Sequence, residues 1–164
     1  MSKKYLEYMG YIERIYQTLD QLDKTPIERD VPLVWEKMHA VSCAHMGRLL
    51  ALRNGMDPEL AAIACLLHDI GRWYSGRQEN HAAQGEVPVR GFLEETELST
   101  DAKEQIVKAV INHSDKQNSG TDLEEIVKDA DILDCYCYGL EFTSSFHAAR
   151  LDRLLKDLSA KLQR

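Results

Sequence analysis

Apolar residues recur every three or four positions along most of the chain, which is the spacing of one face of an α-helix. The first such stripe runs through residues 3–24, at Leu6, Met9, Ile12, Tyr16, Leu19 and Leu22. No segment of useful length alternates apolar and polar positions with an enrichment in β-branched residues, as a half-buried strand does. The pattern therefore predicts an all-α protein, a compact bundle of six to eight helices.

Glycine, proline and capping residues divide this pattern into separate helices. Gly55 can adopt the left-handed conformation that ends a helix, and Asp57 with Pro58 suits the start of the next one. Gly71 is expected to close that helix and to turn the chain sharply. We expect helices over residues 3–24, 33–53, 58–70, 81–95, 97–113 and 123–139 and from 140 to the C-terminus, with loops at 72–80 and 114–122.

Composition and charge limit the class of protein. The chain has 164 residues, of which 44% are hydrophobic, enough for one core. No apolar run is long enough to span a bilayer, and residues 1–14 do not resemble a signal peptide, so we expect a soluble, cytoplasmic protein. The net charge is −7 and no segment forms a basic stripe, so a large nucleic acid is not expected as a partner. The four cysteines contain no CxxC pair and are expected to be reduced, buried thiols.

One segment carries polar residues where an apolar helix face is expected. Residues 60–67 are uncharged and mostly apolar, and His68 and Asp69 follow them directly. Burying an ionised carboxylate without a partner is very unfavourable. Asp131 also lies on an inward stripe, four residues after Val127. A buried acid in each of two helices therefore requires a counter-charge.

Two histidines share these inward faces. His39 lies in the second expected helix, and His113 follows Val110 by three residues. A divalent cation would supply the missing charge, since imidazole nitrogen and carboxylate oxygen are among its usual ligands. The alternative for each residue is a hydrogen-bonded polar pair in the core or a helix cap.

In their order along the chain, these residues resemble a known signature. His39, then His68 with Asp69, then Asp131 is similar to the H…HD…D pattern of the HD-domain superfamily of metal-dependent phosphohydrolases. The segments "HAVSCAHMGRLLA", "ACLLHDIG" and "KDADILD" carry the resemblance, which covers about residues 33–140. It implies a single HD-like domain over 1–164, with the terminal helices packed on the core. It also implies that the four residues hold a divalent metal ion: Mn²⁺, Fe²⁺, Co²⁺, Ni²⁺ or Mg²⁺.

The resemblance extends to two further histidines, His81 and His113. In relatives with such a pair they hold a second metal ion or meet the substrate phosphate. The catalytic residues implied are Asp69, which would ligate the ion and position a water, with His81 and His113, either of which could protonate the leaving oxygen. The branches that hydrolyse cyclic dinucleotides and deoxynucleotide 5′-phosphates are disfavoured, because their additional motifs are absent from this chain.

Basic residues in the two loops that follow these motifs are candidate phosphate donors. Arg72 and Arg77 follow the HDIG segment, and Lys116 follows His113. Ordinary surface charge is an equally good interpretation of each one alone.

Several nearby polar residues are assigned no site role. Asp129 and Asp134 flank Asp131 but fall off its helix face, so they are expected to be solvated or capping. His45 is expected on the surface, and His147 in the core or an oligomer contact.

The favoured function is metal-dependent hydrolysis of a small phosphate mono- or diester, with a nucleotide as the first choice of substrate. The alternative is a non-catalytic regulatory module of the same fold that binds a metal or a nucleotide. A purely structural helical adaptor would leave Asp69 and Asp131 unexplained. The expected partner is a small phosphorylated molecule, and the sequence leaves a homodimer open.

Overall fold

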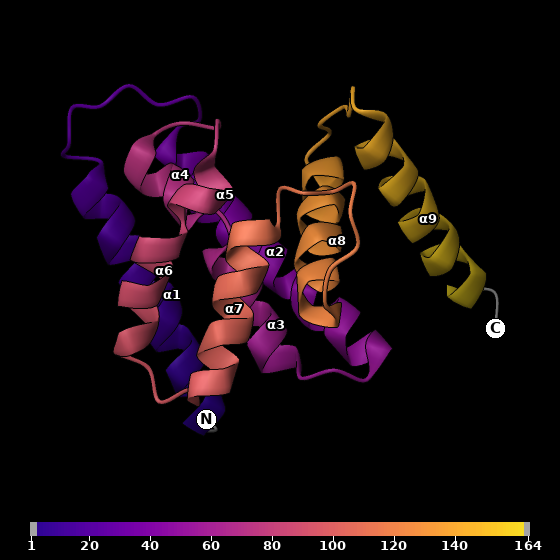
Figure 1. The fold of residues 1–164 in the computed structure, drawn as a ribbon, viewed down its shortest axis with the longest axis horizontal. Coiled ribbons are helices and arrows are strands. Elements are labelled where there is room, and N and C mark those ends of the chain that lie inside the picture. Colours follow the sequence, from indigo (N-terminus) through magenta and orange to yellow (C-terminus); the bar gives the residue numbers. More distant parts are fainter. Residues whose placement is uncertain (1–2, 163–164) are drawn as a thin grey trace.

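The computed structural model describes residues 3–162 of the chain, and the side chains of residues 7–159. All regular secondary structure in this range is helical, which confirms the all-α prediction. The helices are α1 (Lys3–Leu22), α2 (Leu33–Asn54), α3 (Pro58–Leu67), α4 (Ile70–Ser75), α5 (His81–Gln84), α6 (Glu86–Glu94), α7 (Thr100–Asn112), α8 (Asp122–Cys137) and α9 (Ser145–Leu162) (Figure 1). None of them is both long and apolar enough to cross a membrane.

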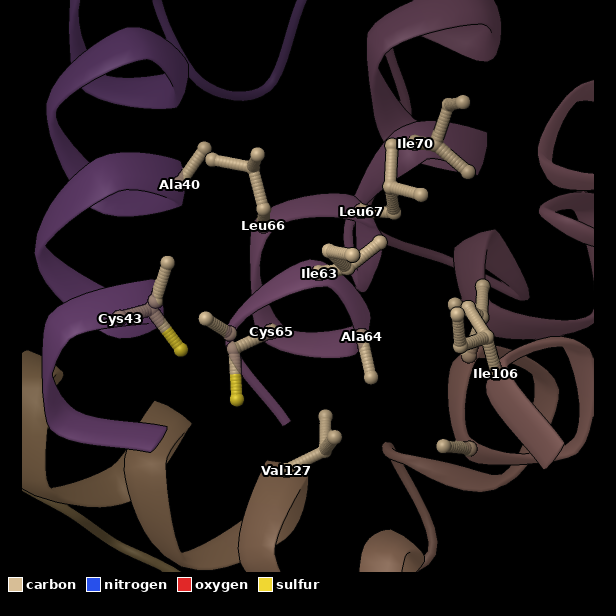
Figure 2. Close-up of a cluster of buried hydrophobic side chains, with 14 of the residues drawn as sticks. Ala40, Cys43, Ile63, Ala64, Cys65, Leu66, Leu67, Ile70, Ile106 and Val127 are labelled. Atoms are coloured by element: carbon tan, nitrogen blue, oxygen red, sulfur yellow. The ribbon is translucent and has the colours of Figure 1, made fainter. Parts of the chain in front are cut away.

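Helix α3 lies at the centre of the bundle and packs against α2, α7 and α8. Every residue from Ala61 to Leu67 is buried, as expected for a helix that is apolar on all sides. Figure 2 shows Cys43 of α2 beside Cys65 of α3, within this core. Helix α9 packs on the outer side of α8 (Figure 1). His68 and Asp69, which directly follow α3, therefore lie in the middle of the molecule.

The expected helix ends form where their chemistry predicts. The Asp57 carboxylate accepts hydrogen bonds from the backbone N–H groups of Glu59 and Leu60 at the start of α3. Gly55 ends α2 in the left-handed conformation, with φ of 71°. Ser99 and Thr121 cap α7 and α8 in the same way as Asp57 caps α3.

The segment after Asp69 differs from the expectation. Helix α3 ends at Leu67, and the chain starts α4 at Ile70, where a loop was expected after residue 71. Gly71 lies inside α4 and does not end a helix; Gly76, with φ of 73°, does so. Gly71 is needed for a different reason: a Cβ there would overlap the backbone of the α5 segment. This close approach brings α5 against the end of α3.

Two further boundaries differ. The helix expected over residues 81–95 is divided at Gly85, so the described residues form nine helical segments. The last helix begins at Ser145, because Gly139, with φ of 82°, turns the chain away after α8.

On α1 the buried face contains Tyr8, Ile15 and Leu19, whereas Met9 and Tyr16 of the expected stripe are exposed and the Leu6 side chain lies outside the described residues. Of the cysteines, Cys135 is half-buried and Cys137 is exposed, contrary to the expectation that all four are buried.

Candidate metal centre

Side chains from α2, α8 and the α3–α4 junction converge at one point. The Nε2 atom of His39 lies 3.1 Å from Nε2 of His68 and 3.2 Å from Oδ1 of Asp131. Nε2 of His68 is 3.2 Å from Oδ2 of Asp69. Residues that are far apart in the sequence therefore present two nitrogens and two carboxylates to a common centre.

The other ring nitrogen of each histidine is already used. Nδ1 of His68 donates to the carbonyl oxygen of Cys65 at 2.7 Å, and Nδ1 of His39 donates to Oδ2 of Asp134 at 2.6 Å. A neutral imidazole that donates from Nδ1 carries a lone pair on Nε2. Burial lowers the pKa of both rings, but Asp131 and Asp134 raise the pKa of His39, and Asp69 raises the pKa of His68 well above its usual range. A cation that displaces the Nε2 proton would therefore find an acceptor nitrogen of each ring turned towards the centre.

A second pair of histidines repeats this arrangement on the other side of Asp69. Nε2 of His81 and Nε2 of His113 are 2.9 Å apart, and they lie 2.9 and 3.4 Å from Oδ1 of Asp69. Nδ1 of His81 donates to the Gln78 carbonyl, and Nδ1 of His113 donates to the Val110 carbonyl. Burial lowers the pKa of His113 to about 4, although Asp69 opposes the shift, so this imidazole is neutral near pH 7.

The donor set fits a divalent cation. Two imidazole Nε2 atoms about 3 Å apart repel one another when both carry lone pairs or both carry protons, and a cation between them converts the repulsion into ligation. Two sets of candidate ligands have donor atoms within 4.8 Å of one another: His39, His68 and Asp131, and His68, Asp69 and His113. Nitrogen and oxygen donors without a thiolate suit Mn²⁺, Fe²⁺, Co²⁺, Ni²⁺ or Mg²⁺. The six residues named from the sequence as candidate ligands are therefore all brought together.

Arg72 and Glu36 hold Asp69 in position. Arg72 is only 7% exposed, so it is not an ordinary surface charge. It donates from Nε and Nη2 to the two carboxylate oxygens of Glu36 at 2.7 and 3.0 Å, and from Nη2 to Oδ2 of Asp69. Burial raises the pKa of Asp69, but the charges of His68 and Arg72 outweigh it and hold that pKa well below the usual range. Glu36 was missed in the sequence, although it is an acid three residues before His39 on the same helix.

Lys116 forms a similar buried ion pair with Asp131. Its Nζ donates to Oδ2 of Asp131 at 2.6 Å, and only 7% of the residue is exposed. Burial raises the pKa of Asp131, yet Lys116 and His39 hold it well below the usual range. Arg77, in contrast, pairs with Glu28 and Asp30 on the surface and does not line the site.

Of the six convergent side chains, all except His68 line a cavity of about 970 Å³. His39, Asp69, Arg72, Lys116 and Asp131 are among its lining residues. His147 also lines this cavity, which corrects its expected place in the core or an oligomer contact. The physical reason is that α9 begins beside the C-terminal end of α8 (Figure 1).

Two other expectations concerned the acids that flank Asp131. Asp134 is neither solvated nor capping: it is 1% exposed and accepts the His39 hydrogen bond, because α2 packs over this side of α8. Asp129 is ion-paired with Arg150 and Arg153 of α9. His45 is exposed on α2, as expected.

Replacing Asp134 with asparagine should weaken metal binding about 10- to 100-fold, the usual effect of losing the outer partner of a ligating histidine. An amide is a weaker acceptor than a carboxylate, so the His39 ring would be held less firmly and its Nε2 atom would be less basic. Calorimetric titration of Mn²⁺ or Ni²⁺ into the chelator-stripped variant measures the change. Asp152→Asn, on the exposed face of α9, is the matched control and should bind like the wild type. Equal affinities in all three proteins would show that Asp134 does not act on the site.

Comparison with known proteins agrees with the fold. Residues 38–135 match the model of the HD domain family, which is more than half of the 164 residues. The chain is 32% identical over 112 residues to "Putative phosphohydrolase YueE" of Bacillus subtilis, covering 58% of this chain and 64% of that protein. It is 33% identical over 96 residues to a ribonuclease Y of Thermus thermophilus, covering 58% of this chain but only 15% of that protein.

A solved structure shares the architecture over the whole chain. It is described as a "predicted HD superfamily hydrolase" from an uncultured Thermotogales bacterium, with a TM-score of 0.61 and 20% sequence identity. The match covers 99% of this chain and 98% of that one, which shows a common fold. From the family match, together with the convergence of His39, His68, Asp69 and Asp131, it follows that the chain belongs to the HD-domain family.

Proposed function

We propose that the protein is a metal-dependent hydrolase of a small phosphate mono- or diester, with a nucleotide as the favoured substrate. One observation carries the proposal: four imidazole Nε2 atoms and two carboxylates converge, and all of these residues except His68 line a cavity of about 970 Å³, beside Lys116. A structural metal site is normally closed by protein ligands, whereas a catalytic one opens to a substrate cavity.

In this proposal His39, His68, Asp69 and Asp131 hold one ion. His81 and His113 hold a second ion together with Asp69, whose two oxygens face the two histidine pairs. A bound divalent ion supplies Lewis acidity towards a phosphoryl oxygen and lowers the pKa of a bound water. The residues of the chain provide the orientation: three carbonyl oxygens and Asp134 hold the four imidazole rings in place.

Lys116 is the better candidate for the phosphate contact than Arg72. Of the five N–H groups of a guanidinium, Arg72 uses four on Glu36, Asp69 and Gln78. Lys116 uses one of its three on Asp131 and borders the cavity. Arg72 would then act mainly by positioning Asp69.

The histidine geometry supports ligation by His81 and His113 over proton donation. Both rings donate from Nδ1 to carbonyl oxygens and turn Nε2 towards the centre beside Asp69, and burial keeps the His113 ring neutral near pH 7 by lowering its pKa to about 4. A general acid would need a proton on that nitrogen.

The experiment is a substrate screen with chelator-stripped protein reloaded separately with Mn²⁺, Fe²⁺, Co²⁺, Ni²⁺ or Mg²⁺. The probes are p-nitrophenyl phosphate, bis-p-nitrophenyl phosphate, nucleotides and a short RNA; the RNA is included because ribonuclease Y is among the relatives. We expect metal-dependent release of phosphate or alcohol from a small ester and little cleavage of the RNA. A protein that binds metal tightly but hydrolyses none of the probes would be the regulatory module instead.

The same preparations test the metal site without reference to activity. A ligand that binds only the folded state stabilises it by about 2.7 kcal/mol at 100 times its dissociation constant. The metal-replete protein should therefore melt several degrees above the stripped one in a thermal denaturation scan. Identical melting curves, with no metal found by elemental analysis of the replete sample, would contradict the assignment.

A further inference from the structure

The outward face of helix α2 is apolar. Its inner side packs mainly against α3 and α8, and Figure 2 shows Ala40 and Cys43 turned towards α3. On the outer side four aliphatic side chains are 64, 45, 62 and 59% exposed: Val34, Met38, Leu49 and Leu52. Single exposed apolar residues are ordinary, but a contiguous set of them on one face marks an interaction site. The outer face of α2 is therefore unlike that of a surface helix in a monomer, which turns charged and polar residues to solvent.

The charged residues of α2 do not cover this face. All residues of the helix are described, and its charged side chains are each ion-paired with another helix: Glu36 with Arg72, Lys37 with Asp20, Arg48 with Glu59 and Arg53 with Asp157. All of these α2 side chains are buried or half-buried. Besides the four aliphatic residues, the exposed positions of α2 are His45 and Asn54. The helix thus directs its charges sideways to its neighbours and leaves its outer face without any.

The outer positions have the spacing of a helix–helix contact. They stand three or four residues apart and form one stripe of about five turns, which we call the α2 stripe: Val34, Met38, Val41, His45, Leu49 and Leu52. The stripe is nearly symmetric about residue 43, because its members lie at almost equal distances on either side of that position. A two-fold interface uses the same patch on both copies, so that residue i contacts residue j and j contacts i. A symmetric stripe meets this requirement when two copies of α2 pack antiparallel.

The charges beside the α2 stripe are compatible with this pairing. Lys37, paired with Asp20, and Arg48, paired with Glu59, lie along the same edge of the stripe and near its opposite ends. When two antiparallel helices pack, this edge of one copy meets the same edge of the other, end to opposite end. Each cation then lies near an acid of the second copy in addition to its own partner, which gives the margin of the contact complementary charges.

We propose that two copies of this chain form a dimer through the α2 stripe, with the two helices antiparallel about a two-fold axis near residue 43. The facing pairs, one residue from each copy, are Val34 with Leu52 and Met38 with Leu49. The inference goes beyond the proposed function and does not depend on it, since α2 turns His39 inward and the stripe outward. A contact along one pair of helices lies near the lower limit of about 1,000 Å² for specific interfaces, so the dimer should dissociate in the micromolar range.

The first test is the mass of the Mn²⁺-loaded protein in solution. Sedimentation velocity is measured over a range of micromolar concentrations. As the concentration rises, the mass should pass from the 18.7 kDa of one chain towards twice that value. A protein that remains at 18.7 kDa throughout would overturn the proposal and leave the stripe to a partner of another kind.

Single charge substitutions locate the contact on the stripe. Met38→Glu and Leu49→Lys each place an unpaired charge in the interface, so the dissociation constant should rise by at least about 100-fold. Both side chains are exposed in the single chain, so each variant should keep the melting curve that circular dichroism gives for a wild-type monomer. Val87→Glu is the matched control, since Val87 is an apolar residue of α6 that is 81% exposed, and it should dimerise like the wild type. Dimers of wild-type strength in both α2 variants would overturn the proposal.

Mixing the two α2 variants tests the antiparallel arrangement. In a mixed dimer the introduced carboxylate of one chain faces the introduced ammonium of the other, while the unaltered Leu49 and Met38 also face each other. The mixture should therefore dimerise although neither variant does so alone. Positions 38 and 49 lie about three turns apart, too far for the new charges to pair within one chain. A parallel pair of helices would set each position against itself and gain nothing from mixing, so a mixture that stays monomeric would contradict the proposed dimer.

Discussion

Asp131→Ala is expected to lose the bound metal and to lower hydrolytic activity by more than about 100-fold, the upper size of the effect of outer-shell changes at metal sites. The substitution removes one ligand and one negative charge at once. Asp131 lies 3.2 Å from Nε2 of His39 and also holds Lys116 by an ion pair of 2.6 Å. Elemental analysis of the purified variant measures the metal, and the best ester from the substrate screen measures the activity.

The fold should survive this substitution. The Asp131 side chain is 18% exposed and borders the cavity, so water can reach the groups that it leaves behind, Lys116 included. His45→Ala is the control, since His45 lies on the same helix as His39 but is exposed. It should keep both metal and activity. Loss of metal in His45→Ala with normal metal content in Asp131→Ala would mean that the wrong helix face and the wrong acid have been assigned.

Gly71→Ala is expected to destabilise the protein by about 3 kcal/mol or more, a size that overpacking reaches when rigid atoms must move. A Cβ at this position would stand 2.6 Å from the backbone nitrogen of Gly85 and 2.9 Å from the carbonyl carbon of Gln84, and closer still to the carbonyl oxygen of His81. All three are backbone atoms, so no side-chain rotation relieves the overlap. Urea denaturation followed by circular dichroism measures the loss of stability.

Gly91→Ala is the matched control for this prediction. Gly91 lies within α6 and has no atom within 4 Å of the position of its Cβ. Alanine should stabilise the helix there by about 0.5–1 kcal/mol, because it restricts the unfolded chain and favours helix. If Gly71→Ala unfolds at the same urea concentration as the wild type, the close packing of α4 against the α5 segment is wrong.

Local chemistry made much of the helical framework predictable from the sequence. Periodicity identified the helices, and Gly55 and Asp57 marked the boundary between α2 and α3 because their effects act within a few residues. The break after Leu67 was not predictable in this way. The polar pair His68–Asp69 leaves the helical pattern to meet groups from other helices, and local propensity contains no information about them.

The candidate ligands could be named from the sequence because a buried acid is so unfavourable that it signals a counter-charge. Asp69 and Asp131 stand out on apolar faces, and the order of the motif adds His39 and His68. Asp134 could not be found by the same reasoning. It lies three residues after Asp131, and only the packing of α2 against α8 brings its carboxylate to the His39 ring.

The sequence by itself determined the helical class and the main helix boundaries, because these follow from local periodicity. It also named Asp69 and Asp131 as acids that would need a counter-charge, because burying a charge has a high free energy. Only the tertiary structure decided how the rings are held, that Arg72 is clamped by Glu36, and that His147 faces the cavity. Arg72 and Glu36 are 36 positions apart in the sequence, and His39 and Asp134 are 95 positions apart. The packing of helices brings such residues together, and no property of either residue in isolation specifies its partner.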